Sequence, residues 1–109
     1  MVAQGDIIQI NFNPVAGSEQ AGYRPAIVVS NNYVISKTHI VSVCPITRNQ
    51  EKSLLTVELD DRTKTQGVVF CAHHRSIDLR ARPYKKVEKV PGDKLIEIVE
   101  LLADMISLV

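Results

Sequence analysis

The sequence predicts an α+β fold: a small, strongly bent β-sheet or barrel of five to seven short strands, followed by one amphipathic helix. Two observations carry this prediction. Short apolar or alternating segments, bounded by glycine, proline and polar residues, fill the first four-fifths of the 109-residue chain, as expected for short strands. Apolar residues at three- and four-residue steps are clear only near the end, as expected for a helix.

The first two expected strands differ in pattern. Apolar Ile8, Ile10 and Phe12 alternate with polar residues, which indicates a strand with one face in solvent. Residues 13–24 carry glycine, serine and proline and predict a loop. The continuous apolar run at 26–29 is typical of a strand buried on both faces.

The hydrophobic pattern is less regular over residues 31–59. Residues 31–37 fit either one helical turn or an open loop. Residues 40–44 form the next expected strand, which we expect Pro45 to end because proline supplies no backbone N–H. Residues 48–53 contain no apolar member and predict a mobile surface loop, and residues 55–59 alternate as a strand does.

Two more strands and the helix complete the chain. We expect a polar turn over 60–67, a buried strand over 68–71 and a weakly alternating strand over 85–90. Pro91 and Asp93 suit a first helical turn, because proline fixes φ and a carboxylate faces the positive helix end. The apolar helix stripe comprises Leu95, Ile98, Val99, Leu102, Met105, Ile106 and Val109. The opposite polar stripe comprises Glu97, Glu100, Asp104 and Ser107. The strands alone do not separate an SH3-like barrel from an OB-fold.

Composition indicates one small domain over residues 1–109. The chain is 45% hydrophobic and 23% charged, which is too apolar for disorder. No stretch approaches the roughly 20 apolar residues that cross a bilayer, and the first six residues do not resemble a secretion signal. We therefore expect a cytoplasmic protein without a membrane partner. Dimerisation would supplement its modest core.

The two cysteines do not predict a disulfide or a metal site. Cys44 and Cys71 are distant in sequence and both lie in apolar runs, so we expect reduced core thiols. His73 and His74 adjoin Cys71, but this spacing fits no zinc module. No metal and no cofactor is predicted.

Charge is distributed unevenly although the net charge is only +1. Residues 75–89 contain six basic residues and two acidic ones, Asp78 and Glu88. From residue 90 onward the chain contains four carboxylates and one lysine. The basic ribbon comprises Arg75, Arg80, Arg82, Lys85, Lys86 and Lys89. It fits a phosphate-binding face. The alternative, which charge alone favours, is a solvated strand edge whose lysines discourage aggregation.

The most specific motif is Gly-Ser-Glu-Gln-Ala-Gly-Tyr-Arg-Pro at residues 17–25. Pro25 restricts Arg24 to extended backbone angles and so aims its side chain. An arginine fork offers bidentate hydrogen bonds to phosphate oxygens. The alternative is a surface arginine paired with Glu19.

Two later segments present further polar groups. Thr47 follows the Cys-Pro-Ile run at 44–46, where a hydroxyl more commonly caps a turn than acts on a ligand. His73 and His74 stand beside Arg75. A histidine in such a place is usually structural.

These segments together resemble the MazF/PemK family of toxin endoribonucleases. The matching stretches, in order, are residues 5–8 (GDII), 17–25, 44–47 (CPIT), 67–69 (GVV) and 75–78 (RSID). The resemblance covers nearly the whole chain. It implies an SH3-like barrel with a C-terminal helix, a homodimer, and ribosome-independent cleavage of single-stranded RNA at short sequences. We expect metal-independent attack of a ribose 2′-hydroxyl on the adjacent phosphate, which fits a sequence without a credible set of metal ligands. The expected products are a 2′,3′-cyclic phosphate and a 5′-hydroxyl.

The resemblance also assigns roles and partners. Arg24 and Thr47 match the main catalytic residues, and Glu19 is expected to orient the arginine or the RNA. Apart from the resemblance, the residue types themselves suggest His73 or His74 as a candidate general base near neutral pH. They also suggest the RNA-binding candidates Ser18, Gln20, Tyr23, Arg48, Arg75, Arg80, Arg82, Lys85 and Lys86. An acidic antitoxin is the implied protein partner, and operator DNA is bound only through the antitoxin complex.

The chain departs from the family after the 68–71 strand. Members usually place Asp-Gln at the positions of Ala72 and His73. In the PemK branch an arginine and an aspartate match Phe70 and Ala72, and a histidine matches Ser18; this chain has none of the three. The arginine–threonine pair must then carry the reaction, which places the chain closer to the MazF branch.

Two other functions remain open. A gyrase poison resembling CcdB shares the expected fold, but the tryptophan at its helix tip has no counterpart in a chain without tryptophan. A non-catalytic RNA- or protein-binding barrel is the second alternative, because Ala72 and His73 replace the usual Asp-Gln.

Overall fold

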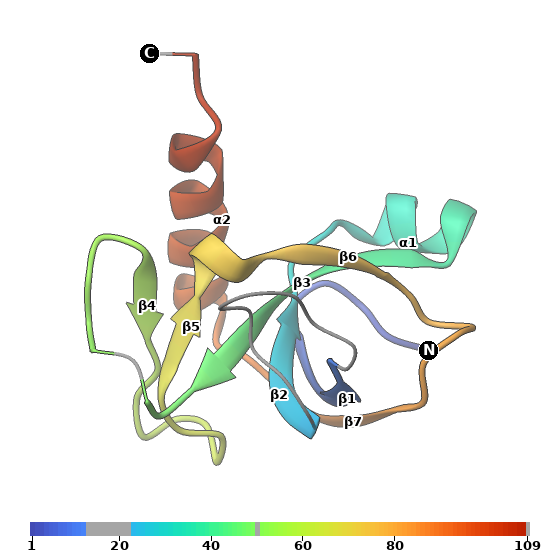
Figure 1. Ribbon diagram of the computed structural model, residues 1–109, viewed down its shortest axis with the longest axis horizontal. Coiled ribbons are helices and arrows are strands. Elements are labelled where there is room, and N and C mark those ends of the chain that lie inside the picture. Colours follow the sequence, from blue (N-terminus) through green and yellow to red (C-terminus); the bar gives the residue numbers. More distant parts are fainter. Residues whose placement is uncertain (13–22, 50, 109) are drawn as a thin grey trace.

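A computed structural model of the chain describes residues 1–12, 23–49 and 51–108, and Figure 1 shows its arrangement. The elements are β1 (Asp6–Asn11), β2 (Tyr23–Val28), α1 (Asn32–Thr38), β3 (Ile40–Thr47), β4 (Thr56–Glu58), β5 (Val68–Phe70), the 3₁₀ turn η1 (Cys71–His73), β6 (Arg75–Asp78), β7 (Tyr84–Lys89) and α2 (Gly92–Met105). The strands form one antiparallel sheet in the order β4-β5-β3-β2-β1-β7, and β6 pairs with β3. No helix of the described residues is long and apolar enough to cross a membrane.

The expected α+β class is confirmed, but the sheet is not closed into a barrel. Within the residues that the structure describes, β4 and β7 end the sheet without pairing with each other (Figure 1). The C-terminal helix α2 packs on one face of this open sheet and contributes to the core there. Ile98 of α2 is fully buried in one cluster with Ile7 from β1 and Val57 from β4. A helix that covers this face removes the need for strand closure.

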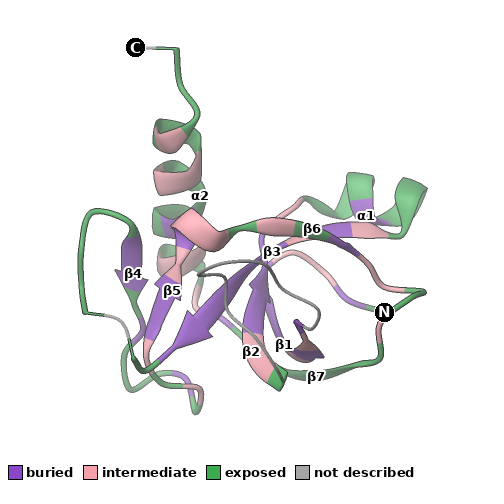
Figure 2. Cartoon of the chain, viewed as in Figure 1, coloured by how far each residue is buried: buried purple, intermediate pink, exposed green. Residues whose placement is uncertain are grey.

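The central strands are buried on both faces, as Figure 2 shows. Ile7 and Ile27 belong to the core under α2, whereas Ile8 and Ala26 belong to a second core that includes Ile35 of α1. The expectation of one solvent-exposed face on the first strand holds only in part, because Ile7 on that face is fully buried under α2 whereas Gln9 and Asn11 are only half-buried.

Pro45 does not end its strand, contrary to the sequence prediction. The N–H and C=O of Ser42 both face the β2 side, so the strand's alternation turns the nitrogen of Pro45 to the opposite side. There the pairing changes from β6, ending at Val43, to β5, starting at Ile46. A missing N–H at this gap costs no ladder hydrogen bond.

Capping groups define α1 and settle the choice between a helical turn and a loop. The side chain of Asn31 accepts a hydrogen bond from the N–H of Val34 at 2.9 Å, a common N-cap. The N–H of His39, a left-handed residue with φ of 59°, donates to the carbonyl of Ile35. The segment is a helix of 7 residues.

The second half differs from expectation in three details. The buried strand ends at Phe70, because Cys71 begins η1, and residues 75–78 form a strand that periodicity did not predict. The last helix ends at Met105, before Ser107 of the expected polar stripe.

Both cysteines are buried free thiols, and contact with Cys71 together with burial raises the pKa of Cys44.

Candidate active site

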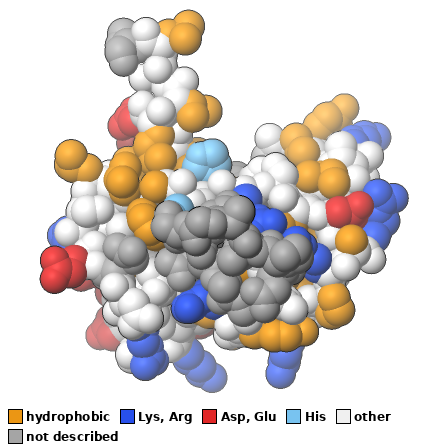
Figure 3. All heavy atoms as spheres, viewed as in Figure 1, with side chains coloured by type: hydrophobic (Ala, Val, Ile, Leu, Met, Phe, Trp, Pro, Cys, Tyr) orange, Lys and Arg blue, Asp and Glu red, His pale blue; other side chains and the backbone are white. Residues whose placement is uncertain are grey.

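A cleft of about 510 Å³ opens where the ends of three strands meet the loop 60–67. Its lining residues are Gln9, Arg24, Pro25, Ile46, Thr47, Arg48, Asn49, Lys64, Thr65 and Gln66. Figure 3 shows Lys and Arg side chains along the lower edge of one face and beside the segment drawn in grey. Both residues of the predicted catalytic pair line this one cleft.

Antiparallel pairing of β2 and β3 brings Arg24 and Thr47 together. Ala26 pairs with Pro45, and continuing this register outward by two residues brings Arg24 opposite Thr47. Arg24 also pairs with Ile10 of β1, so it stands between two strands and is half-buried. Pro25 follows it directly and keeps its backbone extended.

Thr47 is fixed at the end of β3 with only 3% of its surface exposed. Its hydroxyl oxygen accepts a hydrogen bond from the N–H of Asn49 at 3.1 Å, which is the turn-capping role considered from the sequence. This bond uses an oxygen lone pair and leaves the hydroxyl hydrogen to donate elsewhere. Turn capping and donation to a ligand are therefore compatible at Thr47.

Gly67 allows the neighbouring chain to approach Thr47. Its φ of +121° is unfavourable for residues with a side chain, and an added Cβ would lie 2.8 Å from the carbonyl carbon of Thr47 and 3.2 Å from the nitrogen of Arg48. Only glycine permits this approach without movement of Thr47.

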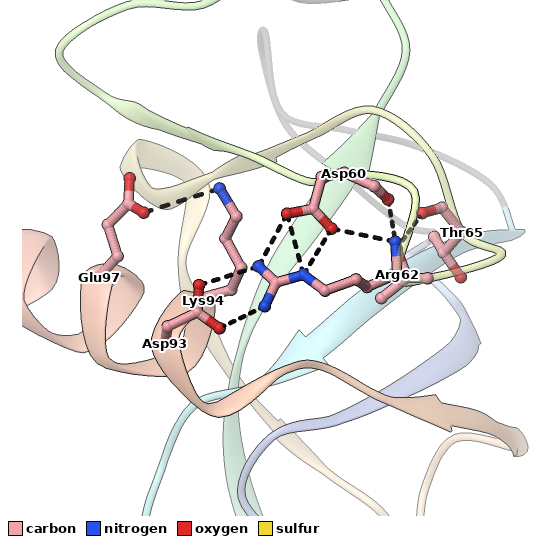
Figure 4. Close-up of polar contacts among 7 residues, drawn as sticks. Asp60, Arg62, Thr65, Asp93, Lys94 and Glu97 are labelled. Carbon is pink, nitrogen blue, oxygen red and sulfur yellow. Dashed lines mark hydrogen bonds and ion pairs between the residues drawn. The ribbon is translucent and has the colours of Figure 1, made fainter.

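An ion-pair network anchors the loop 60–67, as Figure 4 shows. The guanidinium of Arg62 donates to both oxygens of Asp93 at 2.8 and 2.9 Å and to both oxygens of Asp60 at 2.8–3.2 Å. Hydrogen bonds from Arg62 lower the pKa of Asp60 to about 2 and hold the pKa of Asp93 below its usual value. The pairs are exposed, so their energetic contribution is small. Their bidentate geometry nevertheless ties the loop to the first turn of α2.

Of the ten lining residues, only Arg24, Thr47 and Arg48 were predicted from the sequence as site residues. The missed polar residues are Gln9, Asn49, Lys64, Thr65 and Gln66. The 60–67 segment was predicted only as a polar turn. The signal available in the sequence was Gly67, which marks a close approach of two backbone segments.

The predicted residues around the arginine motif have three outcomes. Arg48 lines the cleft beside Thr47. Tyr23 is 66% exposed at the start of β2 and does not line the cleft. The remaining candidates, Ser18, Glu19 and Gln20, lie outside the described residues.

The two histidines lie outside the cleft. The ring of His73 packs on Phe70 with centroids 4.2 Å apart, and its Nδ1 is buried. His74 lines a different groove, of about 510 Å³, beside Val99 and Ile106 of α2. The described geometry does not support either histidine as the base that acts beside Thr47.

The basic ribbon also lies outside the cleft lining. Four of its side chains contact groups of the protein itself: Arg80 pairs with Asp78 at 3.0 Å, Lys86 and Lys89 pair with Asp6 at 3.2 and 3.0 Å, and Arg82 donates to the carbonyl of Asn11 at 2.7 Å. The guanidinium of Arg75 lies 5.6 Å from the centre of the Phe12 ring. Lys85 is exposed on β7, the terminal strand of the described sheet. These contacts agree with the alternative of a solvated strand edge.

The charge of the cleft is positive. Arg24, Arg48 and Lys64 are cations, and no carboxylate occurs among the described lining residues. Clefts lined by one sign of charge concentrate ligands of the opposite sign. In the part of the chain described here, no three His, Cys, Asp or Glu side chains are grouped as metal ligands. The arrangement is suited to holding a phosphate group against a guanidinium and a hydroxyl.

Comparisons with known proteins find one family of toxins. The family model described as "PemK-like, MazF-like toxin of type II toxin-antitoxin system" matches residues 3–106. Endoribonuclease PemK of Escherichia coli is 32% identical over 108 residues, covering 95% of this chain and 81% of the relative. Endoribonuclease toxin MazF of Escherichia coli K12 is 35% identical over 91 residues, covering 84% and 81%. MazF of Deinococcus radiodurans superposes with a TM-score of 0.88 at 33% identity, covering 95% and 94%, and its MazE–MazF complex with 0.82 at 27%, covering 99% and 97%.

Proposed function

This chain belongs to the family of PemK-like, MazF-like toxins of type II toxin–antitoxin systems, and from that premise we propose that it is a sequence-specific endoribonuclease toxin. Its substrate is single-stranded RNA, whose unstacked bases are open to contact. The observation that carries the proposal is that Arg24 and Thr47, from neighbouring strands, line one cationic cleft.

The reaction is attack of a ribose 2′-hydroxyl on the adjacent phosphodiester. The bond from the 2′ oxygen to phosphorus forms, the bond from phosphorus to the 5′ oxygen breaks, and a proton moves from the 2′ oxygen to the departing oxygen. The products are a 2′,3′-cyclic phosphate and a 5′-hydroxyl. RNA is cleaved and DNA is not, because DNA has no 2′-hydroxyl.

Arg24 and Thr47 stabilise the charge that develops on the phosphoryl oxygens. A guanidinium holds two such oxygens with parallel hydrogen bonds. The Thr47 hydroxyl donates a third bond from a fixed position, because Asn49 orients its oxygen. Preorganised donors of this kind contribute about 2.7–4 kcal/mol each. The scheme requires no metal ion.

The protein partner is an acidic antitoxin. A cationic cleft that binds RNA phosphates also attracts a carboxylate-rich extended segment, and MazF of Deinococcus radiodurans has been solved with MazE. Binding of such a segment would compete with RNA, and the joint complex would bind operator DNA. The cytoplasm is the compartment where these partners occur.

A second copy of the chain covers the outer face of α2. Ile96, Val99, Ala103 and Ile106 recur at helical spacing on this face, and the three large side chains among them are 37–73% exposed. Three of these residues line the groove that also contains His74. Apolar faces of this kind typically join subunits. We expect a homodimer in light scattering, converted to a monomer by Val99→Asp; a monomeric wild type would contradict this assembly.

Incubation of the purified protein with a long single-stranded RNA, followed by mapping of the new 5′ ends, tests the proposed function. Cuts at one short recurring sequence, each leaving a 5′-hydroxyl, are the expected result, and a DNA of the same sequence should remain whole. Intact RNA that is still bound by the protein would favour the non-catalytic barrel. Intact RNA, together with gyrase–DNA complexes trapped in a parallel reaction that contains gyrase and DNA, would favour the gyrase poison.

A further inference from the structure

The carboxylate of Glu88, on β7, binds the tip of the loop 60–67. One oxygen, Oε1, accepts the backbone N–H of Lys64 at 3.0 Å. The other, Oε2, accepts both the backbone N–H and the hydroxyl of Thr65, each at 2.8 Å. Hydrogen bonds to an ionised carboxylate are about twice as strong as neutral ones. The tip of a polar surface loop is thus held by a residue 23 positions away from it.

A β-bulge presents Glu88 to the loop. The pairing of β7 with β1 steps from Lys86–Ile8 to Glu88–Ile7, so two residues of β7 span one residue of β1. Bulges re-aim the side chains that follow them. Directly paired residues share a sheet face, so Glu88 lies on the face of Ile7, where the core under α2 is built.

The ionisation of Glu88 agrees with this contact. Partial burial by itself raises the pKa of its carboxyl group. The N–H and O–H groups of Thr65 and the N–H of Lys64 outweigh that effect and leave the pKa below its usual value. The carboxylate is charged at neutral pH and accepts all three bonds.

The residues that Glu88 holds form one wall of the cleft. Lys64 and Thr65 line it together with Arg24 and Thr47, whereas Glu88 is not among the lining residues. Glu88 accepts a hydrogen bond from the backbone N–H of Lys64, and the lysine's ammonium group acts on Glu88 through its charge. The loop contacts Thr47 through Gly67, at its end, and not through the two residues that Glu88 holds.

We propose, on the basis of the function argued above, that Glu88 is a positioning residue for RNA binding: it holds Lys64 so that its ammonium group binds a phosphate next to the one that is cut. Loss of Glu88 then weakens RNA binding and leaves the chemical step intact. Loss of Lys64 has the same effect, and the two effects do not add, because one residue acts through the other.

The test compares kcat and KM of wild type, Glu88→Gln, Lys64→Met and the double variant on an RNA oligonucleotide that contains a mapped cut site. Glutamine keeps the size of the side chain but replaces one acceptor oxygen by an amide donor. We expect each single variant to raise KM about 5- to 10-fold with kcat unchanged, and the double variant to match Lys64→Met alone. Glu100→Gln, which removes an exposed carboxylate from α2, is the control with wild-type constants.

A second readout, amide hydrogen exchange, does not depend on activity. The N–H groups of Lys64 and Thr65 should exchange faster in Glu88→Gln, and Glu88→Asp should restore part of the KM. Wild-type KM in Glu88→Gln, a fall in kcat alone, additive single effects or unchanged exchange would each overturn the inference. If wild type cleaves RNA and Glu88→Gln cleaves it equally well, only this inference fails; if wild type cleaves no RNA, the proposed function fails first.

Discussion

Gly67 lies so close to Thr47 that a Cβ on the glycine would come within 2.8 Å of the carbonyl carbon of Thr47. The loop 60–67 and the end of β3 meet at this point, and each forms part of the cleft. The close approach therefore connects the placement of Gly67, at the end of the loop, to the placement of the Thr47 hydroxyl.

Gly67→Ala should reduce both stability and activity. The φ of +121° is strained for alanine by about 1–3 kcal/mol, and the added methyl displaces Thr47. Gly92→Ala is the matched control, because a Cβ at Gly92 meets nothing within 4 Å. Thermal unfolding and kcat of both variants check this. Equal melting temperatures for the two variants, with wild-type kcat in Gly67→Ala, would contradict the account.

Thr47→Val should lower kcat about 10²–10³-fold, because it removes one preorganised donor and keeps the shape of the side chain. Thr47→Ser retains the hydroxyl and should keep most of the activity. Single-turnover rates on RNA separate this loss from weaker binding. Equal rates for the valine and serine variants would show that the hydroxyl takes no part in the reaction.

Cleavage should continue after metal removal. The proposed scheme stabilises the phosphoryl charge with a guanidinium and a hydroxyl and uses a nucleophile that belongs to the RNA. Dialysed protein in excess EDTA is expected to cut at the wild-type rate. Loss of cleavage in EDTA that magnesium restores would refute the scheme.

Acid should weaken the fold through Asp6, a fully buried carboxylate that pairs with Lys86 and Lys89. Burial raises its pKa, but the ion pair with Lys89, the hydrogen bond from the N–H of Ala3 and the ion pair with Lys86 together lower it below 3.8. A lowered folded-state pKa stabilises the fold above pH 3.8, and this contribution is lost as the pH falls through the folded-state value.

Melting temperatures of Asp6→Asn and wild type, measured from pH 7 to pH 2.5, check this sign. The variant should be less stable at pH 7, and the difference should shrink below about pH 3.8. Asp61→Asn, which alters an exposed carboxylate, should show little difference at any pH. A constant gap between Asp6→Asn and wild type across the range would contradict the prediction.

The fold was predictable to the extent that local pattern determines it. Alternation located β1, a continuous apolar run located β2 and helical spacing located α2, and the capping residues of α1 follow known preferences. Burial of Ile7, on the otherwise polar face of β1, was not predictable, because it depends on the packing of α2 there. Pro45 was misread because its effect depends on which side of β3 its nitrogen faces.

The cleft was predictable where it rests on motifs and not where it rests on distant contacts. Arg24 and Thr47 were identified from their motifs, and the register of β2 and β3 brings them together. Lys64 and its neighbours were missed, since their placement depends on Glu88, more than 20 residues away.

The basic ribbon shows that a count of charges along a sequence does not predict which cations can bind a ligand. Its lysines looked available for phosphate, but Asp6, about 80 residues away in the chain, pairs with Lys86 and Lys89. Charge totals do not reveal which cations are already paired.

The single-turnover cleavage rate of Arg24→Ala tests the central claim most directly. Removal of this guanidinium should lower the rate at least 10²–10³-fold with an unchanged melting temperature, whereas Lys37→Ala, which removes a cation from α1, should leave the rate unaffected. A folded Arg24→Ala variant that cleaves RNA at the wild-type rate would contradict the assignment of this cleft as the active site.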